Sequence, residues 1–438
     1  MTGQIFFDPQ RKRWKRLRRI LDVVAVFSTV ILVLFFLGIV RNQKLPELLL
    51  PTPKRNYRAL TDRQSAAYMR ARSLRMARRK AYRGPSESPL DSGEALRAAY
   101  YVDDDPGSYS SLKSHIHQID VLFPQWLYVV SPEGTLQGAS VAQYPARVFN
   151  LVGENGVRSV DPQDKVRDLI ASSHEDTAIL PLLSNYNVLK QDWDPAVSAM
   201  LKNPQARQNL EQQLDKFFAA NPGYRGLSLD LEELPDDSLA DYRTLIGELY
   251  LRMHPKNLRL YVNESIGADD DELAFLAQNS DGILLMNYDQ HEVSSGPGPI
   301  AAQDWFEDNL KRALKVVPKE KLLCAIGNYG YDWTMSLQSK GHPAKVLNVD
   351  SISVQDGWQA ASDADADVHL EGDELNPHFA YDDEDNHVRH QVWMLDSVTA
   401  LNEMRAARQM GLQAFALWRL GSEDPSLWSI WDHPNLPN

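Results

Sequence analysis

The chain has 438 residues, 43% of them hydrophobic, and a formal net charge of −13 at pH 7. This length can bury a large core, as one big α/β domain or as two smaller ones. The charge is segregated, because residues 1–83 hold 20 Lys and Arg against 4 Asp and Glu, whereas residues 84–438 hold 26 against 55, a net of −29. So acidic a body argues against nucleic acid as a partner.

The N-terminal part contains a candidate membrane span. Ile20 to Val40 is an apolar run of 21 residues whose only charge is Asp22, near one end, and this length can cross a bilayer. Seven basic residues at positions 11–19 precede the run, which by the positive-inside rule keeps the N-terminus in the cytoplasm. The sequence therefore predicts a cytoplasmic basic tail at residues 1–19 and a single transmembrane helix at 20–40. The lipid partner is the inner (cell) membrane of a bacterium, and the body faces the periplasm or the outside.

A cleaved signal peptide is the alternative to this signal-anchor. The apolar run is longer than the usual core of a signal peptide, and no small-x-small cleavage site follows it before Pro46, so the pattern favours an anchor. Arg41, Lys44 and further basic residues follow the span and weaken the charge asymmetry that sets the topology. Residues 41–94 are predicted to form a basic stalk. Its stretch Arg70–Arg83 is typical of a helix that is either solvated or rests on anionic lipid.

From residue 95 to residue 432, short apolar runs alternate with segments of helical periodicity. This rhythm predicts βα units and a parallel sheet. Eight runs with intervening helices fit a closed (β/α)8 TIM barrel of the α/β class. The predicted strands are Ala98–Asp103, Val121–Val130, Ala178–Leu183, Gly226–Glu232, Leu258–Glu264, Gly282–Asp289, Lys321–Tyr329 and Gln413–Trp418. The predicted helices are Pro204–Ala220, Leu239–His254, Asp271–Gln278, Trp305–Val316 and Ser397–Met410.

The connection between the seventh and eighth runs, from Tyr331 to His390, is too long for a plain loop and helix. It contains a strand-like segment at Val346–Ser353 and another, followed by a turn, from Phe379. We therefore expect a small α+β insertion at about 331–390. The sequence shows no internal repeat and no metal-ligand spacing such as HExxH or CxxC.

Polar or aromatic residues follow nearly every predicted strand. In barrels of this kind the active site lies at the C-terminal ends of the strands, so these residues are candidates for a site. They are Asp103, Asp104, Asn185, Tyr186, Asp230, Glu232, Asn263, Glu264, Tyr288, Asp289, Tyr329, Tyr331, Trp418 and Arg419.

The stretch 226–233, Gly-Leu-Ser-Leu-Asp-Leu-Glu-Glu, is the most informative of these ends. Side chains alternate along a strand, so Ser228, Asp230 and Glu232 share one face. Two carboxylates side by side at the end of a buried strand repel each other and lose solvation, which raises the pKa of at least one of them. A carboxylic acid that stays protonated near neutral pH can act as a general acid. The alternative is an edge strand with a solvated face, but the leucines at 227, 229 and 231 indicate that the other face is covered as well.

The sequence from Gly226 to Glu232 resembles the fourth-strand signature of family 18 glycoside hydrolases, the chitinase-like enzymes, which usually reads Asp-Gly-x-Asp-x-Asp-x-Glu. Three further segments resemble motifs of that family in the same order along the chain. Leu284–Asp289 is similar to the sixth-strand Met-x-Tyr-Asp, Ala325–Gly330 to the seventh-strand Gly-x-x-x-Tyr-Gly, and Ala416–Trp418 to the eighth-strand tryptophan. The resemblance extends over about residues 95–432 and includes the insertion.

The resemblance implies a glycosidase that uses a substrate-assisted, retaining mechanism. Glu232 would protonate the glycosidic oxygen while the 2-acetamido oxygen of the sugar attacks the anomeric carbon. Asp230 would orient the acetamido group and stabilise the oxazolinium charge, Tyr288 and Asp289 would bind the same group, and Trp418 would form an apolar floor under the sugar ring. The other candidate substrate-binding residues are Ser228, Asn263, Met286, Tyr329 and Tyr331. Met286 is interpreted as packing beside Tyr288, and Tyr331 either lines the groove or anchors the insertion. The resemblance implies no metal and no cofactor.

Two residues depart from the family signature. Ser228 stands where the family usually has Asp, and Arg225 stands where it has the Asp before the glycine. A serine can hydrogen-bond Asp230, but it cannot share a proton or add negative charge. We therefore expect Asp230 to ionise more easily than in an ordinary chitinase, and activity to be weak or narrowed to an unusual substrate.

The predicted function is hydrolysis of a β-linked polysaccharide that contains N-acetylglucosamine. The chain also resembles the membrane-anchored, chitinase-like segment that bacteria fuse ahead of a polysaccharide deacetylase domain and a family 2 glycosyltransferase domain. This implies fused or associated domains of those kinds and a role in making or trimming an exported polymer. Two alternatives stay open, a non-catalytic glycan-binding barrel that guides such a polymer and a peptidoglycan hydrolase. The retention of both Asp230 and Glu232 favours catalysis.

Overall fold

The computed structural model describes residues 21, 28–29, 96–140, 147–160, 163–173, 175–337, 343–370, 372 and 374–431. The predicted tail and stalk, and nearly all of the predicted span at 20–40, lie outside these residues. Within the described ranges, no helix is both long and apolar enough to cross a membrane. The fold below belongs to one compact unit, Arg79–Asn438.

Eight parallel strands close into a barrel. In the order in which they pair, the strands are β1 (Leu96–Tyr101), β19 (Ala414–Trp418), β14 (Leu322–Gly327), β13 (Gly282–Met286), β12 (Arg259–Ser265), β11 (Gly226–Asp230), β8 (Leu182–Ser184) and β2 (Val121–Tyr128). The ring is complete because β1 pairs with β19, Leu96 opposite Ala414, and also with β2, Ala98 opposite Val121. A short strand β7 (Ala178–Ile179) pairs with β2 as well. The (β/α)8 barrel predicted from the sequence is confirmed.

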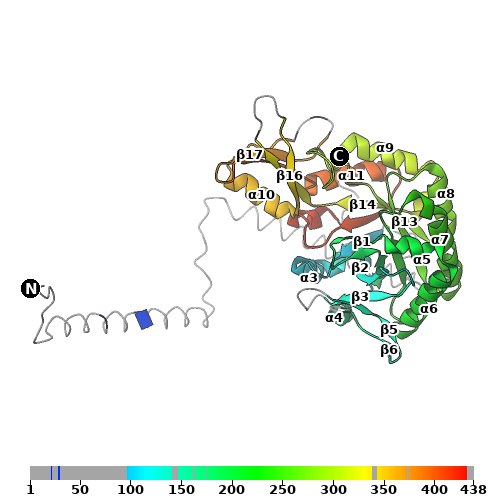
Figure 1. Ribbon diagram of the computed structural model, residues 1–438. Helices are drawn as coiled ribbons and strands as arrows, with labels where there is room; N and C mark the ends of the chain where they lie inside the picture. The colour runs from blue at the N-terminus through cyan, green and yellow to red at the C-terminus, as the bar shows by residue number, and fades with distance from the viewer. Residues whose placement is uncertain are drawn as a thin grey trace, which may run out of the picture. The chain divides into compact units, whose positions relative to one another are not determined.

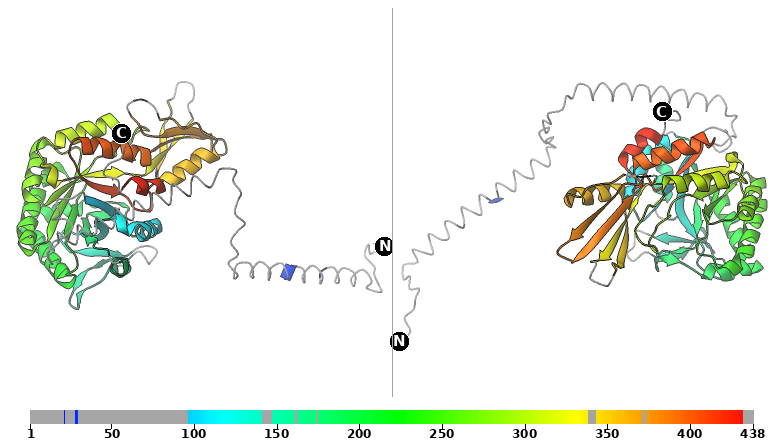
Figure 2. Two further views of the ribbon diagram at one scale, coloured as in Figure 1. Left: turned by 180° about the vertical axis from the view of Figure 1, so that it is seen from behind. Right: turned by 90° about the horizontal axis from the view of Figure 1, so that it is seen from above.

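Helices lie outside this ring of strands, and α5 to α9 form an arc around it (Figures 1 and 2). Side-chain caps start several of them: Asn203 accepts a hydrogen bond from Gln205 N at α6, and Asp396 accepts from the amides of residues 398 and 399 at α11. The helices around the barrel are α3 (Pro106–His115), α4 (Gln163–Ser173), α5 (Ala196–Lys202), α6 (Pro204–Ala220), α7 (Leu239–Met253), α8 (Asp270–Asn279), α9 (Gln303–Ala313), α11 (Ser397–Gln409) and α12 (Trp428–Trp431).

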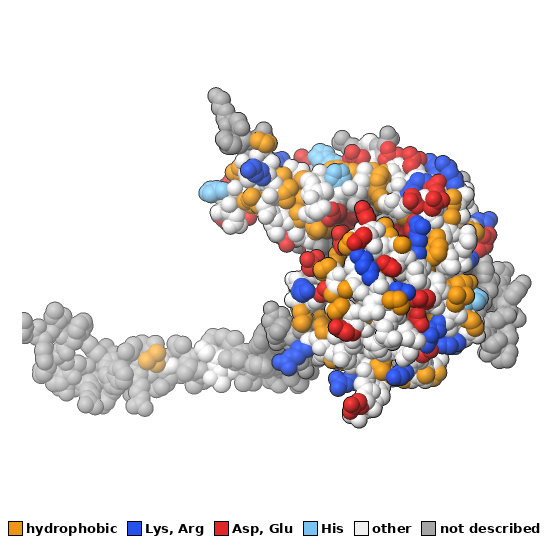
Figure 3. Space-filling model, turned by 45° about the vertical axis from the view of Figure 1, so that its right-hand side comes forward, with side chains coloured by type: hydrophobic (Ala, Val, Ile, Leu, Met, Phe, Trp, Pro, Cys, Tyr) orange, Lys and Arg blue, Asp and Glu red, His pale blue; other side chains and the backbone are white. Residues whose placement is uncertain are grey.

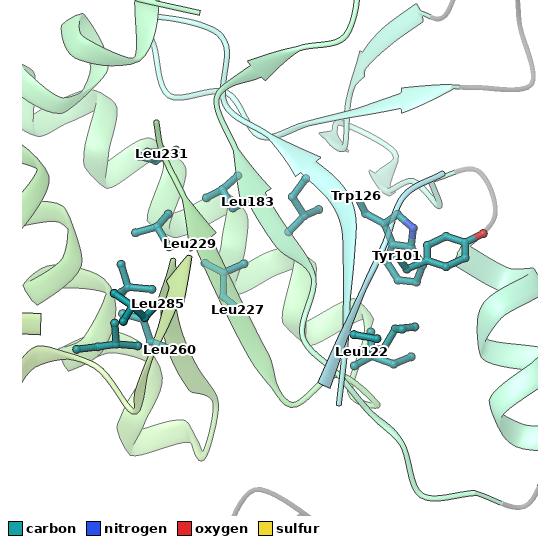
Figure 4. Packing of buried hydrophobic residues seen from close by; sticks show 14 of the residues in the cluster. Tyr101, Leu122, Trp126, Leu183, Leu227, Leu229, Leu231, Leu260 and Leu285 are labelled. Carbon is teal, nitrogen blue, oxygen red and sulfur yellow. The ribbon is translucent and has the colours of Figure 1, made fainter. Parts of the chain in front are cut away.

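The core has two parts because side chains alternate along each strand. Leu227, Leu229 and Leu231 of the β11 segment point out of the barrel and pack with Leu260 and Leu285 in the layer below the helices (Figure 4). Each fully buried leucine stabilises the fold by about 1.5–3 kcal/mol. The other side chains of β11 point to the barrel interior, which is how the fold brings polar residues to its mouth.

Gly226 is required at the start of β11 by a close approach of two strands. A Cβ at this position would lie 2.0 Å from the backbone oxygen of Arg259 on β12. Any side chain would therefore push β11 away from β12. The glycine fixes the pairing of these two strands, in which Ser228 lies opposite Tyr261.

Between β14 and α11 the chain forms a separate antiparallel sheet, which we call the lobe (residues 330–394). Its strands pair in the order β16 (Val346–Ile352), β15 (Gly330–Ser336), β18 (Val388–Met394) and β17 (His378–Asp383). Helix α10 (Val354–Asp363) covers one face of this sheet around Phe379 and Val392. On the other face, Tyr331 and Trp333 join the inner core of the barrel. The lobe projects to one side of the barrel (Figures 1 and 2).

Small antiparallel additions follow the second and third barrel strands and were not predicted. Strands β3 (Gln137–Ser140) and β4 (Arg147–Asn150) extend the sheet beyond β2. The other two additions are the pair β5 (Val152–Gly153) and β6 (Gly156–Val157), and the pair β9 (Tyr186–Asn187) and β10 (Asp192–Trp193).

Candidate active site

Asp230 and Glu232 lie at the C-terminal end of β11, in the mouth of the barrel. Asp230 is buried and Glu232 is partly buried, and the two carboxyl groups affect each other's ionisation. Burial raises the pKa of Asp230 above its usual range, against the opposing effect of hydrogen bonds from Asn263 and Glu232. Burial, together with the negative charges of Asp230, Asp289 and Glu233, raises the pKa of Glu232 further, so Glu232 holds the proton at neutral pH. The raised pKa expected from two adjacent carboxylates is confirmed.

Ser228 does not use its hydroxyl to bond Asp230 directly. Instead, Ser228 Oγ donates to Asn263 Oδ1 at 2.9 Å, and Asn263 Nδ2 donates to Asp230 Oδ1 at 3.0 Å. Asn263 of β12 lies beside both residues and takes up the hydrogen-bonding groups of each. Ser228 has no exposed surface, so its contact is with Asn263 and not with a ligand at the mouth.

Asn185 holds the backbone of Glu232. Its Nδ2 donates to the carbonyl oxygen of Glu232 at 2.9 Å, and its Oδ1 accepts from the amide of Glu232 at 2.9 Å. Asn185 follows β8 directly and is almost completely buried. The pair of bonds continues the β8–β11 ladder one step past Asp230, which is paired with Ser184. Its position at a strand end was visible in the sequence, but its partner was not.

Asp289 is fixed by two tyrosines. Its Oδ1 accepts a hydrogen bond from Tyr329 and another, at 3.0 Å, from Tyr331 on the first strand of the lobe. Burial raises the pKa of Asp289, and the two phenols oppose that rise. Tyr331 is therefore both a support for Asp289 and the point where the lobe joins the barrel, which favours the anchoring interpretation. Tyr288 is buried beside Tyr329, with ring centroids 6.0 Å apart and rings perpendicular.

Aromatic side chains form the base of the mouth. Trp418, at the end of β19, contacts Tyr100 of β1 edge to face, with ring centroids 5.0 Å apart. Burial and the charges of Asp230 and Glu232 raise the pKa of Tyr100 well above its usual range, so its phenol stays neutral. Met286 is partly buried and packs against the same inner cluster, as interpreted from the sequence. Tyr100 was not predicted as a site residue, although it lies two residues after Ala98 and so shares the inner face of β1 with it.

Two further aromatic pairs lie on the β9–β10 pair and on the lobe. Tyr186 and Trp193 of the β9–β10 pair meet edge to face at 5.4 Å between centroids. In the lobe, His378 stacks on Trp393 at 3.9 Å. All four side chains are partly exposed. The surface is hollowed between the lobe and the barrel, and Asp and Glu side chains gather around this hollow (Figure 3).

Fold and site together define a TIM barrel whose candidate active site is built on a pair of buried carboxyl groups. Within the described part of the chain, no cluster of His, Cys, Asp and Glu could hold a metal ion. The arrangement can supply a proton from Glu232 to an atom in the mouth and place the charge of Asp230 beside it.

No family model matches the chain. In sequence it is 24% identical over 257 residues to the uncharacterized glycosylase YvbX of Bacillus subtilis, a match that covers 56% of this chain and 72% of that protein. Its fold is similar to that of a chitinase from Chromobacterium violaceum, with a TM-score of 0.63, 21% identity, and coverage of 78% of this chain and 98% of the chitinase. It is also similar to that of the spore cortex-lytic enzyme SleL of Bacillus cereus, with a TM-score of 0.62, 16% identity, and coverage of 77% and 73%. These solved structures share the barrel fold with this chain.

Proposed function

We propose that the chain is a glycosidase that hydrolyses a β-linked glycan containing N-acetylglucosamine. The observation that carries this is the pair of carboxyl groups at the end of β11, in which Asn263 bonds Asp230, Asn185 holds the backbone of Glu232, and Glu232 keeps the proton. The motifs that resemble family 18, the fold shared with a chitinase and the sequence similarity to a glycosylase support it.

In the proposed mechanism the substrate supplies the nucleophile. Glu232 protonates the glycosidic oxygen, and the acetamido oxygen of the bound sugar attacks the anomeric carbon with retention of configuration. Asp230 stabilises the positive charge of the oxazolinium, Tyr288 and Asp289 bind the acetamido group, and Trp418 forms the floor. Glu232, now ionised, then takes a proton from the water that opens the oxazolinium ring.

The test is product analysis after incubation with N-acetylglucosamine oligomers and with the same oligomers after N-deacetylation. We expect cleavage of the acetylated oligomers only, with the β-anomer formed first in an NMR time course. Cleavage of fully deacetylated oligomers would contradict substrate assistance, because they bring no acetamido group. Binding without turnover would favour the glycan-binding barrel instead.

Hydrolysis of peptidoglycan is a second candidate function. The specific observation is the fold shared with a spore cortex-lytic enzyme. Incubation with purified peptidoglycan, followed by analysis of soluble muropeptides, separates the two candidates. Release of muropeptides at a rate above that on N-acetylglucosamine oligomers would favour the cell wall as substrate.

The proposed location is the outer side of a bacterial inner membrane, with residues 20–40 as the anchor and residues 41–94 as the stalk. The apolar run and the basic block before it support this. We also propose that the protein processes an exported amino-sugar polymer, next to deacetylase and glycosyltransferase domains. Protease added to intact spheroplasts should digest the barrel, and complete protection would contradict the topology.

A further inference from the structure

We propose that Ser228 and Asn263 are positioning residues that act as a one-way hydrogen-bond relay, which keeps Asp230 ionised and leaves the proton of the carboxyl pair on Glu232. This rests on the proposed function, because it concerns the same pair of carboxyl groups. It goes beyond that function, because it assigns a task to the serine that replaces an acidic residue of the family signature.

The relay is defined by two hydrogen bonds between buried groups. Ser228 Oγ donates to Asn263 Oδ1 at 2.9 Å, and Asn263 Nδ2 donates to Asp230 Oδ1 at 3.0 Å. All three side chains are more than nine-tenths buried. A carboxamide has one acceptor end and one donor end. With the serine hydroxyl at its acceptor end, Asn263 therefore presents N–H to Asp230, and an N–H favours an ionised carboxylate.

The opposite orientation of the amide is disfavoured by the serine. If Asn263 turned over, Oδ1 would face Asp230, and a hydrogen bond between these two groups would need a protonated Asp230. The hydroxyl of Ser228 would then lose its acceptor. Within the described part of the chain this hydroxyl has no other acceptor, and a buried donor without a partner is costly. The orientation of Asn263 and the ionisation of Asp230 are thus tied to each other.

The groups that face the carboxyl pair from other elements also favour a proton on Glu232. Asp289, after β13, and Glu233, after β11, add negative charge near Glu232 and favour its protonated form. The phenols of Tyr100 on β1, Tyr242 on α7 and Tyr288 after β13 also lie within range of the pair, and burial keeps them neutral. An Asp at position 228 would bring a third titrating group, whereas the serine brings a neutral donor. The mouth therefore titrates as two coupled carboxyl groups.

The test is a direct titration of Asp230 and Glu232 in the full chain. Asp and Glu are labelled with ¹³C at their carboxyl carbons, and the two signals are assigned by their loss in Asp230→Asn and Glu232→Gln. We expect Ser228→Ala and Asn263→Leu each to raise the pKa of Asp230 by about one unit, the effect of one hydrogen bond to a charged group. The double variant should match Asn263→Leu alone, because the serine acts only through the amide.

Two results would overturn the relay: an Asp230 titration that Ser228→Ala leaves unchanged, or effects of the two variants that add. Ser228→Ala removes a single oxygen atom, so it decides the matter even if Asn263→Leu does not fold. The matched control is Asn221→Leu, which removes a buried amide bonded to Gln163 and Phe217 at the other end of β11. It should lower thermal stability without moving either titration.

The kinetic readout is the pH profile on N-acetylglucosamine oligomers. Ser228→Ala should lower kcat about tenfold and shift the acidic limb to higher pH, with little change in KM, since the charge of Asp230 matters in the transition state. If the wild-type chain cleaves no such oligomer, the proposed function fails, while the titration still decides the relay.

Discussion

Two of the places where this barrel buries carboxyl groups differ in their surroundings. Asp230 and Glu232 lie inside the mouth, where Asp230 accepts a hydrogen bond from Asn263 and Asn185 holds the backbone of Glu232. Glu403, on α11, lies outside the ring of strands and is 1% exposed, and neither of its carboxyl oxygens has a hydrogen-bond partner in the described part of the chain. Burial raises the pKa in both places. A raised pKa alone therefore does not mark a catalytic site; the hydrogen-bonding partners that fix its geometry do.

The largest effect should come from Glu232→Gln. The amide keeps the shape and the hydrogen bonding but has no proton to give, so hydrolysis of N-acetylglucosamine oligomers should fall by about 10²–10⁴ while binding persists. The matched control is Glu403→Gln, the same change at the buried carboxyl group of α11. It should leave kcat unaltered. Equal loss of activity in both variants would remove the distinction between the two places.

Asn185→Leu should have the next largest effect. Without the two bonds to the backbone of Glu232, the proton donor shifts, and a displacement of about 1 Å can cost about 10²-fold in rate. The loss should appear in kcat rather than in KM, as measured by steady-state kinetics. An unchanged kcat with a lowered melting temperature would show that Asn185 is only a structural residue.

Glu403→Met should stabilise the fold. It removes a buried carboxyl group that has no partner and fills the same space with an apolar chain, which should raise the free energy of unfolding at pH 7 by about 1–3 kcal/mol. Denaturant titration of both proteins measures this. A destabilised variant would indicate that a partner satisfies Glu403 in solution.

The stability of the wild type should also depend on pH through Glu403. Its pKa is raised in the folded state, so the folded state binds the proton more tightly than the unfolded state does. The resulting stability is fully present below the unfolded pKa of about 4.3 and is lost as the pH rises toward the folded pKa. Above pH 5, the melting temperature of the wild type should therefore fall more steeply than that of Glu403→Met. If the melting temperatures of the two proteins fall in parallel as the pH rises, the pKa of Glu403 is not raised in the folded state.

The smallest effect should come from Tyr331→Phe. It removes one of the two phenols that oppose the raised pKa of Asp289, so Asp289 is less ionised at a given pH and supports the protonated form of Glu232 less. The alkaline limb of the pH–rate profile should shift to lower pH, with a loss of a few-fold in rate at the optimum. If the alkaline limb stays at the wild-type pH, the charge of Asp289 does not affect the pKa of Glu232.

Strong local patterns in the sequence predicted most of the barrel. The eight apolar runs and the helices that correspond to α6 to α9 and α11 were each located within a few residues. Helix α3 was not predicted, because only Ser108 and Leu112 of its ten residues are buried and no apolar stripe is present. The proximity of Asp230 and Glu232 is local, so it was predictable. The contacts of Ser228 with Asn263 and of Asn185 with Glu232 depend on strand register, which no local pattern encodes.

The way the chain enters and leaves the lobe makes this segment exchangeable. Its first and last strands, β15 and β18, are hydrogen-bonded neighbours, with Gly330 opposite Met394. The entry from β14 and the exit to α11 therefore lie side by side. The segment between them can differ in length without stretching a long loop across the barrel. Lobes of different size could be exchanged at this junction with the strand order unaltered, so the length and depth of the groove could evolve independently of the residues that carry the chemistry.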